Sequence, residues 1–255
     1  MPNLKPNLSY TIWFSQRTGS TLLCKALEET GIAGKPNEWL NVPGEPDLLV
    51  HYQVDTHAEL QDYLWQLGST SNGVFGLKFG FSEPRVTHHL DALRQFPDCP
   101  HDANSRVIIW HHAFPNSRHI FMTRRNKIRQ AVSWWKAIKT QEWHRENGAT
   151  EAKPDLGDAY RFEAIDHLYD ECSMREAGIQ AFFSEGGIVP LTIVYEDFIE
   201  TYSETIRQML DFLGLDDKTV TIPSPYYVKL ADEISEEWVQ RFREEKQRGW
   251  QNRGW

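Results

Sequence analysis

The sequence has no uninterrupted apolar run of about 18 residues, the length from which a membrane-spanning helix is recognised. Its first residues also lack a basic segment followed by a long apolar stretch, so we expect no signal peptide. Cysteine is scarce: Cys24, Cys99 and Cys172 are odd in number and far apart, which indicates neither a disulfide framework nor a zinc cluster. These absences favour a cytoplasmic protein in a reducing environment.

The composition excludes a disordered or fibrous chain. Hydrophobic residues make up 40% and charged residues 25% of the 255 positions, close to the average of globular proteins. The sequence contains no internal repeat and no low-complexity segment. No linker is long enough to require a second domain, so we expect residues 1–255 to form a single domain.

Charge is distributed unevenly along the chain. The net charge of −9 argues against general binding of nucleic acids or membrane surfaces. Residues 103–141, however, hold eight basic residues and no acidic residue, which leaves 19 basic and 36 acidic residues elsewhere. This concentration of positive charge favours binding of a small anion, with a solvated basic face as the alternative.

Hydrophobic patterning indicates an α/β fold. Short β-prone runs predict strands over residues 9–14, 74–79, 118–123 and 189–195. Apolar residues at helical spacing predict a helix that follows residue 19 and stops at residue 31, and helices over residues 126–139, 158–184, 199–213 and 232–247. Residues 35–71 are expected to form a loop and helices over one edge of the site. Strands separated by helices predict three layers around a central, mainly parallel sheet.

The loop at residues 15–21 is a candidate anion site at the carboxyl end of the first predicted strand. Gly19 permits a tight turn and close approach to a ligand. Ser20 and Thr21 open the following helix, whose free amides and dipole attract anions, and Arg17 adds a positive charge. The loop lacks the Walker A lysine, so a nucleoside triphosphate is not expected. The alternative is an ordinary capped helix.

A second candidate anion site follows the third predicted strand, where Arg124 and Arg125 occur. Arg125, Arg129 and Ser133 are spaced four residues apart and share one face of a helix. Guanidinium groups and a hydroxyl suit a phosphate, although a basic surface stripe is the alternative. Two anion sites at neighbouring strand ends indicate a ligand with two separated anionic groups, such as a nucleotide phosphorylated at its 5′ and 3′ positions.

These motifs resemble those of a known family. Residues 15–23, Ser-Gln-Arg-Thr-Gly-Ser-Thr-Leu-Leu, resemble the 5′-phosphosulfate loop of the sulfotransferases. Arg125, which precedes Ser133 by eight residues, resembles their 3′-phosphate motif, and residues 195–198, Tyr-Glu-Asp-Phe, resemble a later strand-end motif. With Gly-Lys-Pro-Asn-Glu at residues 34–38, the order of motifs resembles the bacterial trehalose 2-sulfotransferase family over most of the chain.

The resemblance implies a P-loop-like fold, the donor 3′-phosphoadenosine 5′-phosphosulfate and no metal. It also implies a carbohydrate or related small metabolite as acceptor, and suggests a homodimer. Carried over by position, the residues that would hold the 5′-phosphosulfate are Arg17, Thr18, Gly19, Ser20 and Thr21. The residues that would hold the 3′-phosphate are Arg125 and Ser133, with Arg129 as a further candidate.

The catalytic assignments depend on the same resemblance. Glu38 would be the general base that accepts the proton of the acceptor hydroxyl. Arg17 and Lys78 would stabilise the leaving phosphate. Cytosolic sulfotransferases instead use a histidine after a strand lysine, and no histidine directly follows Lys78.

Some features leave other functions open. A kinase-like phosphotransferase and a non-catalytic nucleotide-binding protein are the alternatives. Trp39, Trp134 and Trp135 lie beside the motifs and offer flat faces that suit sugar rings. The histidine pairs at residues 88–89 and 111–112 have no carboxylate or cysteine beside them at ligand spacing, so metal binding is not expected there.

Overall fold

The computed structural model describes residues 5–41, 47–100, 104–149, 156, 159–216, 218, 220–228 and 230–250. Its strands are β1 Leu8–Phe14, β2 Val74–Gly80, β3 Ser117–Thr123 and β4 Leu191–Val194. Its helices are α1 Ser20–Glu29, α2 Leu48–Tyr52, α3 His57–Gly68, α4 Glu83–Leu93, α5 Arg106–Ala113, α6 Lys127–Thr140, α7 Phe162–Gly186, α8 Tyr195–Glu200, α9 Tyr202–Phe212 and α10 Glu233–Gln247.

The four strands form one parallel sheet in the order β2-β1-β3-β4. Phe14 pairs with Gly80 on one side and with Met122 on the other, so the carboxyl ends of β1, β2 and β3 meet at one edge. This arrangement confirms the prediction of a central, mainly parallel sheet. It also brings the segment after β1 beside the segment after β3, where the two candidate anion sites were predicted.

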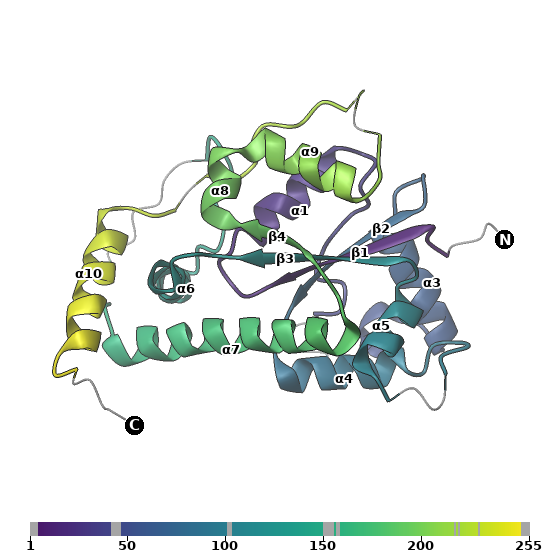
Figure 1. Ribbon diagram of the computed structural model, residues 1–255, viewed down its shortest axis with the longest axis horizontal. Helices are drawn as coiled ribbons and strands as arrows, with labels where there is room; N and C mark the ends of the chain where they lie inside the picture. Colours follow the sequence, from purple (N-terminus) through teal and green to yellow (C-terminus); the bar gives the residue numbers. More distant parts are fainter. Residues whose placement is uncertain are drawn as a thin grey trace.

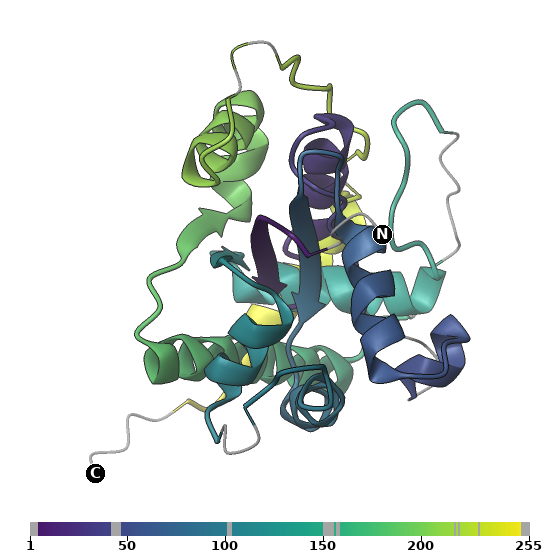
Figure 2. The same cartoon turned by 90° about the vertical axis from the view of Figure 1, so that its right-hand side faces the viewer.

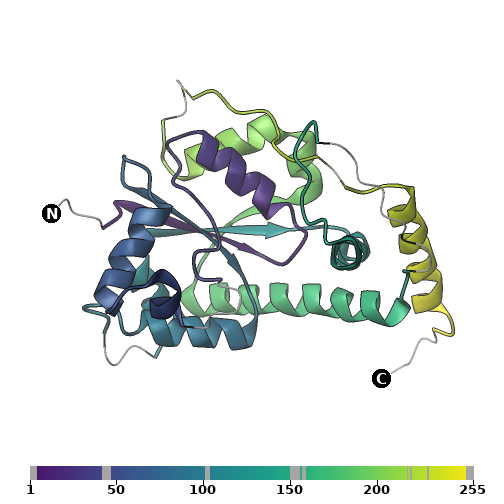
Figure 3. The same cartoon turned by 180° about the vertical axis from the view of Figure 1, so that it is seen from behind.

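Helices cover both faces of the sheet, which gives the expected three layers (Figure 1). On one face, Tyr10 and Ile12 pack with α1 and α9. On the other, Trp13 packs with α3, α4, α5 and α7. The same layering is visible from the side and from behind (Figure 2, Figure 3). A third cluster joins α6, α7 and α10 at the end of the molecule toward which β3 points (Figure 1).

Several element boundaries differ from the expectations. The last strand ends at Val194, because Tyr195 already opens α8. The helix predicted over residues 199–213 is divided at Thr201, where the backbone leaves the helical region between α8 and α9. The helix predicted over residues 158–184 runs over Phe162–Gly186, and residue 158 lies outside the described residues.

Two helices between β2 and β3, α4 and α5, were not predicted. The first begins with Glu83 and a proline at its amino-terminal turn, which is a favourable helix start. Residues 35–71 contain α2 and α3, as expected for this part of the chain, apart from residues 42–46, which lie outside the described residues. Cys24, Cys99 and Cys172 are buried and free. Within the described ranges, no helix has both the length and the hydropathy needed to cross a membrane.

Candidate active site

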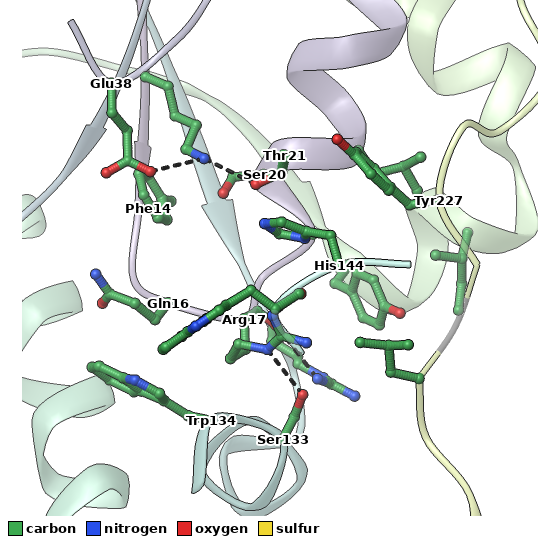
Figure 4. Close-up of a pocket in the computed structure, with 18 of the residues that line it drawn as sticks. Phe14, Gln16, Arg17, Ser20, Thr21, Glu38, Ser133, Trp134, His144 and Tyr227 are labelled. Carbon is green, nitrogen blue, oxygen red and sulfur yellow. Dashed lines mark hydrogen bonds and ion pairs between the residues drawn. The ribbon is translucent and has the colours of Figure 1, made fainter. Parts of the chain in front are cut away.

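A cavity of about 670 Å³ lies at the carboxyl ends of β1 and β2 (Figure 4). Ligands of parallel α/β sheets bind at this edge. Its walls come from the loop after β1, the start of α1, Lys78 on β2 and two residues of α6, Ser133 and Trp134. The segments at residues 143–144 and 225–231 also contribute side chains, so parts of the chain far apart in sequence meet around it.

The loop at residues 15–21 turns sharply into α1. Gly19 has φ +81°, and a Cβ atom there would lie 2.6 Å from Cδ2 of Tyr195, so both the backbone and the space require glycine. No described side chain caps the start of α1, and its first turn has no acidic residue. These free helix-start amides suit an anion. The hydroxyl of Thr18 donates to Ser15 O within the loop rather than facing the cavity.

A buried network of hydrogen bonds anchors this loop to the rest of the fold. Ser15 Oγ donates to Glu176 at 3.0 Å and accepts a hydrogen bond from Gln130 at 2.8 Å. The same carboxylate accepts from Lys127 at 2.6 Å and from Thr123 at 2.9 Å. The network ties the loop to β3, α6 and α7 and so fixes its position before any ligand binds.

Arg17 crosses the floor of the cavity. Its backbone has φ +66°, and its Nε atom donates to Ser133 Oγ at 3.1 Å (Figure 4). Its Nη1 atom donates to the carbonyl oxygen of Trp143. Burial, followed by the positive charge of Arg124, lowers the pKa of Arg17 to about 10. Arg17 of the first loop is therefore in direct contact with Ser133, one of the residues predicted for the second anion site.

Arg124 also lines this cavity, which the sequence motif did not assign. Its guanidinium lies 4.6 Å from the ring centroid of Tyr195, and its Nε atom lies 3.5 Å from a carboxylate oxygen of Glu196. That buried Nε atom makes no hydrogen bond within the described part of the chain. Burial lowers the pKa of Arg124. Arg124 thus brings a largely buried positive charge to the wall of the cavity, where an anion could bind.

Arg125 and Arg129 are not among the described residues that line the large cavity. The Arg125 side chain is 62% exposed, and its Nη2 atom lies 2.8 Å from Asp197. Arg129 pairs with Glu236 and borders a cavity of about 30 Å³ that Ser133 also borders. Successive side chains at a strand end point in different directions, and the sequence alone could not tell which arginine faces inward.

Lys78 and Glu38 form an ion pair that lines the same cavity. Nζ of Lys78 lies 2.9 Å from Oε1 of Glu38 and donates to Thr21 Oγ1, also at 2.9 Å. Asn41 donates to the other carboxylate oxygen of Glu38 at 2.7 Å. Lys78 N donates to Asn37 O, so the segment that carries Glu38 runs along the edge of β2. All three predicted catalytic residues, Arg17, Lys78 and Glu38, line one cavity.

The sequence did not single out His144. The ring of His144 lines the cavity, 5.1 Å from the ring of Tyr227. Burial, followed by the positive charges of Arg17 and Lys78, lowers its pKa to about 4. It lies in an irregular segment that follows α6, outside the motifs, so no spacing pattern marked it.

Of the tryptophans and paired histidines that the sequence singled out, one tryptophan lines the cavity. Trp134 lines the cavity, whereas Trp39 and Trp135 are not among the described residues that do so. Nε2 of His111, an exposed residue, lies 2.9 Å from Nε2 of the buried His119. Among the residues that the structure describes, no three His, Cys, Asp or Glu side chains are grouped so that they could hold a metal ion.

Comparison with known proteins relates this site to one family. Residues 9–245 match the family model of the Stf0 sulphotransferases. A trehalose 2-sulfotransferase of Mycobacterium tuberculosis (strain ATCC 35801 / TMC 107 / Erdman) is 31% identical over 266 residues, which cover 94% of this chain and 96% of the relative. A trehalose 2-sulfotransferase of Mycolicibacterium smegmatis is 26% identical over 272 residues, with the same coverage of both chains.

Among solved structures, a sulfotransferase from Alicyclobacillus acidocaldarius aligns with a TM-score of 0.49 and 15% identity, covering 94% of this chain and 92% of that one. The family model spans nearly the whole chain and agrees with the resemblance that the sequence motifs indicated. The chain belongs to the Stf0 sulphotransferase family, a family of sulfotransferase enzymes.

Proposed function

We propose that this chain transfers a sulfuryl group from 3′-phosphoadenosine 5′-phosphosulfate to a hydroxyl of a carbohydrate, with trehalose as the first candidate. The observation that carries the proposal is the meeting of Arg17, Ser133 and the Lys78–Glu38 pair in one cavity. The names of the two mycobacterial relatives support trehalose as the starting point. The family match over residues 9–245 supports a single sulfotransferase domain.

The donor fits the chemistry of the residues present. The helix-start amides of Ser20 and Thr21 and the guanidinium of Arg17 would hold the 5′-phosphosulfate, with Gly19 allowing close approach. Thr18 would contribute through its backbone, since its hydroxyl is bonded within the loop. Arg124 and Ser133 would hold the 3′-phosphate. The motif-based assignments of Arg125 and Arg129 stay predictions.

The reaction requires one bond to form and one to break. The acceptor hydroxyl oxygen bonds to sulfur while the bond from sulfur to the bridging phosphate oxygen breaks, and that oxygen keeps the electron pair. The products are the sulfated acceptor and adenosine 3′,5′-bisphosphate. Glu38 would take the hydroxyl proton. Lys78 and Arg17 would stabilise the negative charge that develops on the departing phosphate oxygen.

The acceptor would enter beside Glu38. Phe14 and Gln16 lie on the Glu38 side of Arg17, whereas Tyr227 lies on the other side and Trp134 lies near Ser133 (Figure 4). Trp134 is 8% exposed and the Arg175 guanidinium lies 5.0 Å from its ring centroid, so only the part of the ring that borders the cavity could meet a sugar. Gln16 accepts a hydrogen bond from Arg175 at 2.8 Å, which leaves its amide nitrogen to donate to a sugar hydroxyl. We therefore place the acceptor on the first side and the nucleoside of the donor on the second.

Donor labelled in its sulfuryl group, supplied with trehalose and a panel of other sugars and alcohols, tests the proposal. We expect label in trehalose or a related sugar. Calorimetry with adenosine 3′,5′-bisphosphate and with ATP-magnesium separates the alternatives. Binding of ATP with indifference to the bisphosphate would favour a kinase-like phosphotransferase, and bisphosphate binding without turnover across the panel would favour a non-catalytic protein.

A further inference from the structure

We propose that His144 is a further catalytic residue, whose imidazole donates a hydrogen bond to the sulfuryl group during transfer. This inference rests on the proposed function, because it concerns the same donor in the same cavity. The segment that carries His144 contains none of the sequence motifs. Its support comes from the position of the ring, the charges around it and the protonation that they favour.

The position of His144 is fixed by its neighbours in the chain. Trp143 O accepts a hydrogen bond from Arg17, so the segment is attached directly to the anion loop. Arg145 O accepts a hydrogen bond from Val228 N at 3.0 Å, and the His144 ring lies against Tyr227. Held from both sides, the imidazole lies between Thr21 and Arg17 (Figure 4), and the charge of Lys78 acts on it as well.

The titratable groups around the ring come from five parts of the fold. Arg17 belongs to the loop after β1, Lys78 to β2, and Glu38 to the segment after α1. Tyr227 faces the ring from the segment before α10, and Glu142 lies in the segment of His144 itself, paired with Arg145 at 2.7 Å. The sulfuryl group would lie among Arg17, Lys78 and Glu38 during transfer. The imidazole would then be one of the side chains that surround the sulfuryl group.

Donor binding would change the protonation of this ring. Without the donor, burial and the neighbouring cations keep His144 neutral near neutral pH, since they lower its pKa to about 4. The donor brings phosphate and sulfate charges among the same cations, and nearby negative charge favours the imidazolium. The charged ring donates from both nitrogens. It would then stabilise charge on the sulfuryl and bridging oxygens, as preorganised donors do in other transfer reactions.

A purely structural role is the main alternative. In that case the ring would only support Tyr227, and any aromatic side chain would replace it. His144→Phe preserves the aromatic contact and removes both nitrogens, so it separates the two roles. His144→Gln retains one donor without the ability to gain a proton. His167→Gln is the matched control, because His167 is exposed on α7 and is not among the described residues that line the cavity.

Calorimetry of bisphosphate binding, in two buffers of different ionisation enthalpy at about pH 6, measures proton uptake without turnover. We expect the wild type and His167→Gln to take up more protons than His144→Phe, by up to about one per site. Protonation of the ligand itself cancels in this difference. Equal uptake by the wild type and His144→Phe would overturn the coupling, and failure to bind the bisphosphate at all would instead contradict the proposed function.

Turnover supplies the second readout. We expect His144→Phe to lower kcat by about 10² to 10³-fold, the cost of removing one preorganised donor, with a smaller change in the donor KM. His144→Gln is expected to retain more activity than His144→Phe. A His144→Phe enzyme with wild-type kcat would overturn the inference even if the wild type transfers sulfuryl groups as proposed.

Discussion

Nζ of Lys78 lies 2.9 Å from a carboxylate oxygen of Glu38, and the same nitrogen donates to the hydroxyl of Thr21. One buried ammonium therefore links the proposed base to the start of α1, where the donor would bind. The link arises because the segment that ends at Glu38 pairs with the edge of β2. It holds the carboxylate in one orientation before the acceptor arrives, which is the preorganisation that proton transfer requires.

Glu38→Gln is expected to separate binding from turnover. The amide keeps the size of the side chain but cannot accept the acceptor proton, so kcat should fall by about 10² to 10⁴-fold. Affinity for adenosine 3′,5′-bisphosphate, measured by calorimetry, should stay within about threefold of the wild type. Glu244→Gln, an exposed change on α10, is the control. Undiminished turnover in Glu38→Gln would remove Glu38 from the role of base.

Arg124→Gln and Arg125→Gln together decide which arginine holds the 3′-phosphate. Arg124 lines the cavity and is largely buried, whereas Arg125 is exposed and pairs with Asp197 at the surface. Loss of a charged hydrogen bond costs roughly 1.5 to 3 kcal/mol, or about 10 to 100-fold in affinity. We expect that loss for bisphosphate binding in Arg124→Gln and less than about threefold in Arg125→Gln. The reverse order would support the motif-based assignment.

Gly19→Ala tests the turn that shapes the anion loop. Alanine at this position would have to adopt the φ of +81° that the turn imposes, and its Cβ atom would lie 2.6 Å from the Tyr195 ring. Gly31 is the matched control, because it has φ +73° and a Cβ atom added there would have no described atom within 4 Å. We expect both alanines to lower the free energy of unfolding by about 1 kcal/mol or more, with Gly19→Ala the more costly. Only Gly19→Ala should abolish bisphosphate binding. Equal effects on stability and binding would show that contact with Tyr195 is unimportant.

The sequence predicted the features that depend on local pattern. Alternating strands and helices predicted the parallel sheet, and the resemblance of the run at residues 34–38 to a family motif singled out Glu38. The structure explains that run: a Cβ atom on Gly34 would lie 2.7 Å from Gly76 N, and Pro36 packs against the same glycine. Close packing of this segment on β2 carries Glu38 to Lys78. The resemblance to the family motif was sufficient here because the path of this short segment is set within a few residues.

The features that the sequence did not predict depend on side-chain direction and on distant contacts. Arg124 and Arg125 are equivalent by composition, and only the path of the chain after β3 directs one of them inward. His144 reaches the cavity because its segment is held by Val228 and by Arg17. Neither contact leaves a periodic signal in the sequence. The centre of the site was therefore predictable, but the full set of residues around it was not.

Acid should destabilise the fold through a buried histidine remote from the cavity. Trp13 Nε1 donates to His119 Nδ1 at 3.0 Å, and His119 Nε2 contacts His111. The ring is only 4% exposed. Burial, followed by His111, lowers the pKa of His119 from 6.5 to about 3. The unfolded chain therefore binds the proton first as the pH falls below 6.5, and the folded state loses stability from there down to about pH 3.

Urea unfolding at pH 7, 6 and 5 measures this loss. His119 alone should lower the free energy of unfolding by about 2 kcal/mol between pH 7 and pH 5, because the unfolded state gains the proton and the folded state does not. His119→Gln removes the titrating ring, so its stability should fall less steeply over the same interval, whatever the substitution costs at pH 7. His167→Gln, exposed on α7, should keep the wild-type slope. A His119→Gln protein with the wild-type slope would mean that His119 does not remain neutral in the fold, and the hydrogen bond from Trp13 would then have to be reassigned.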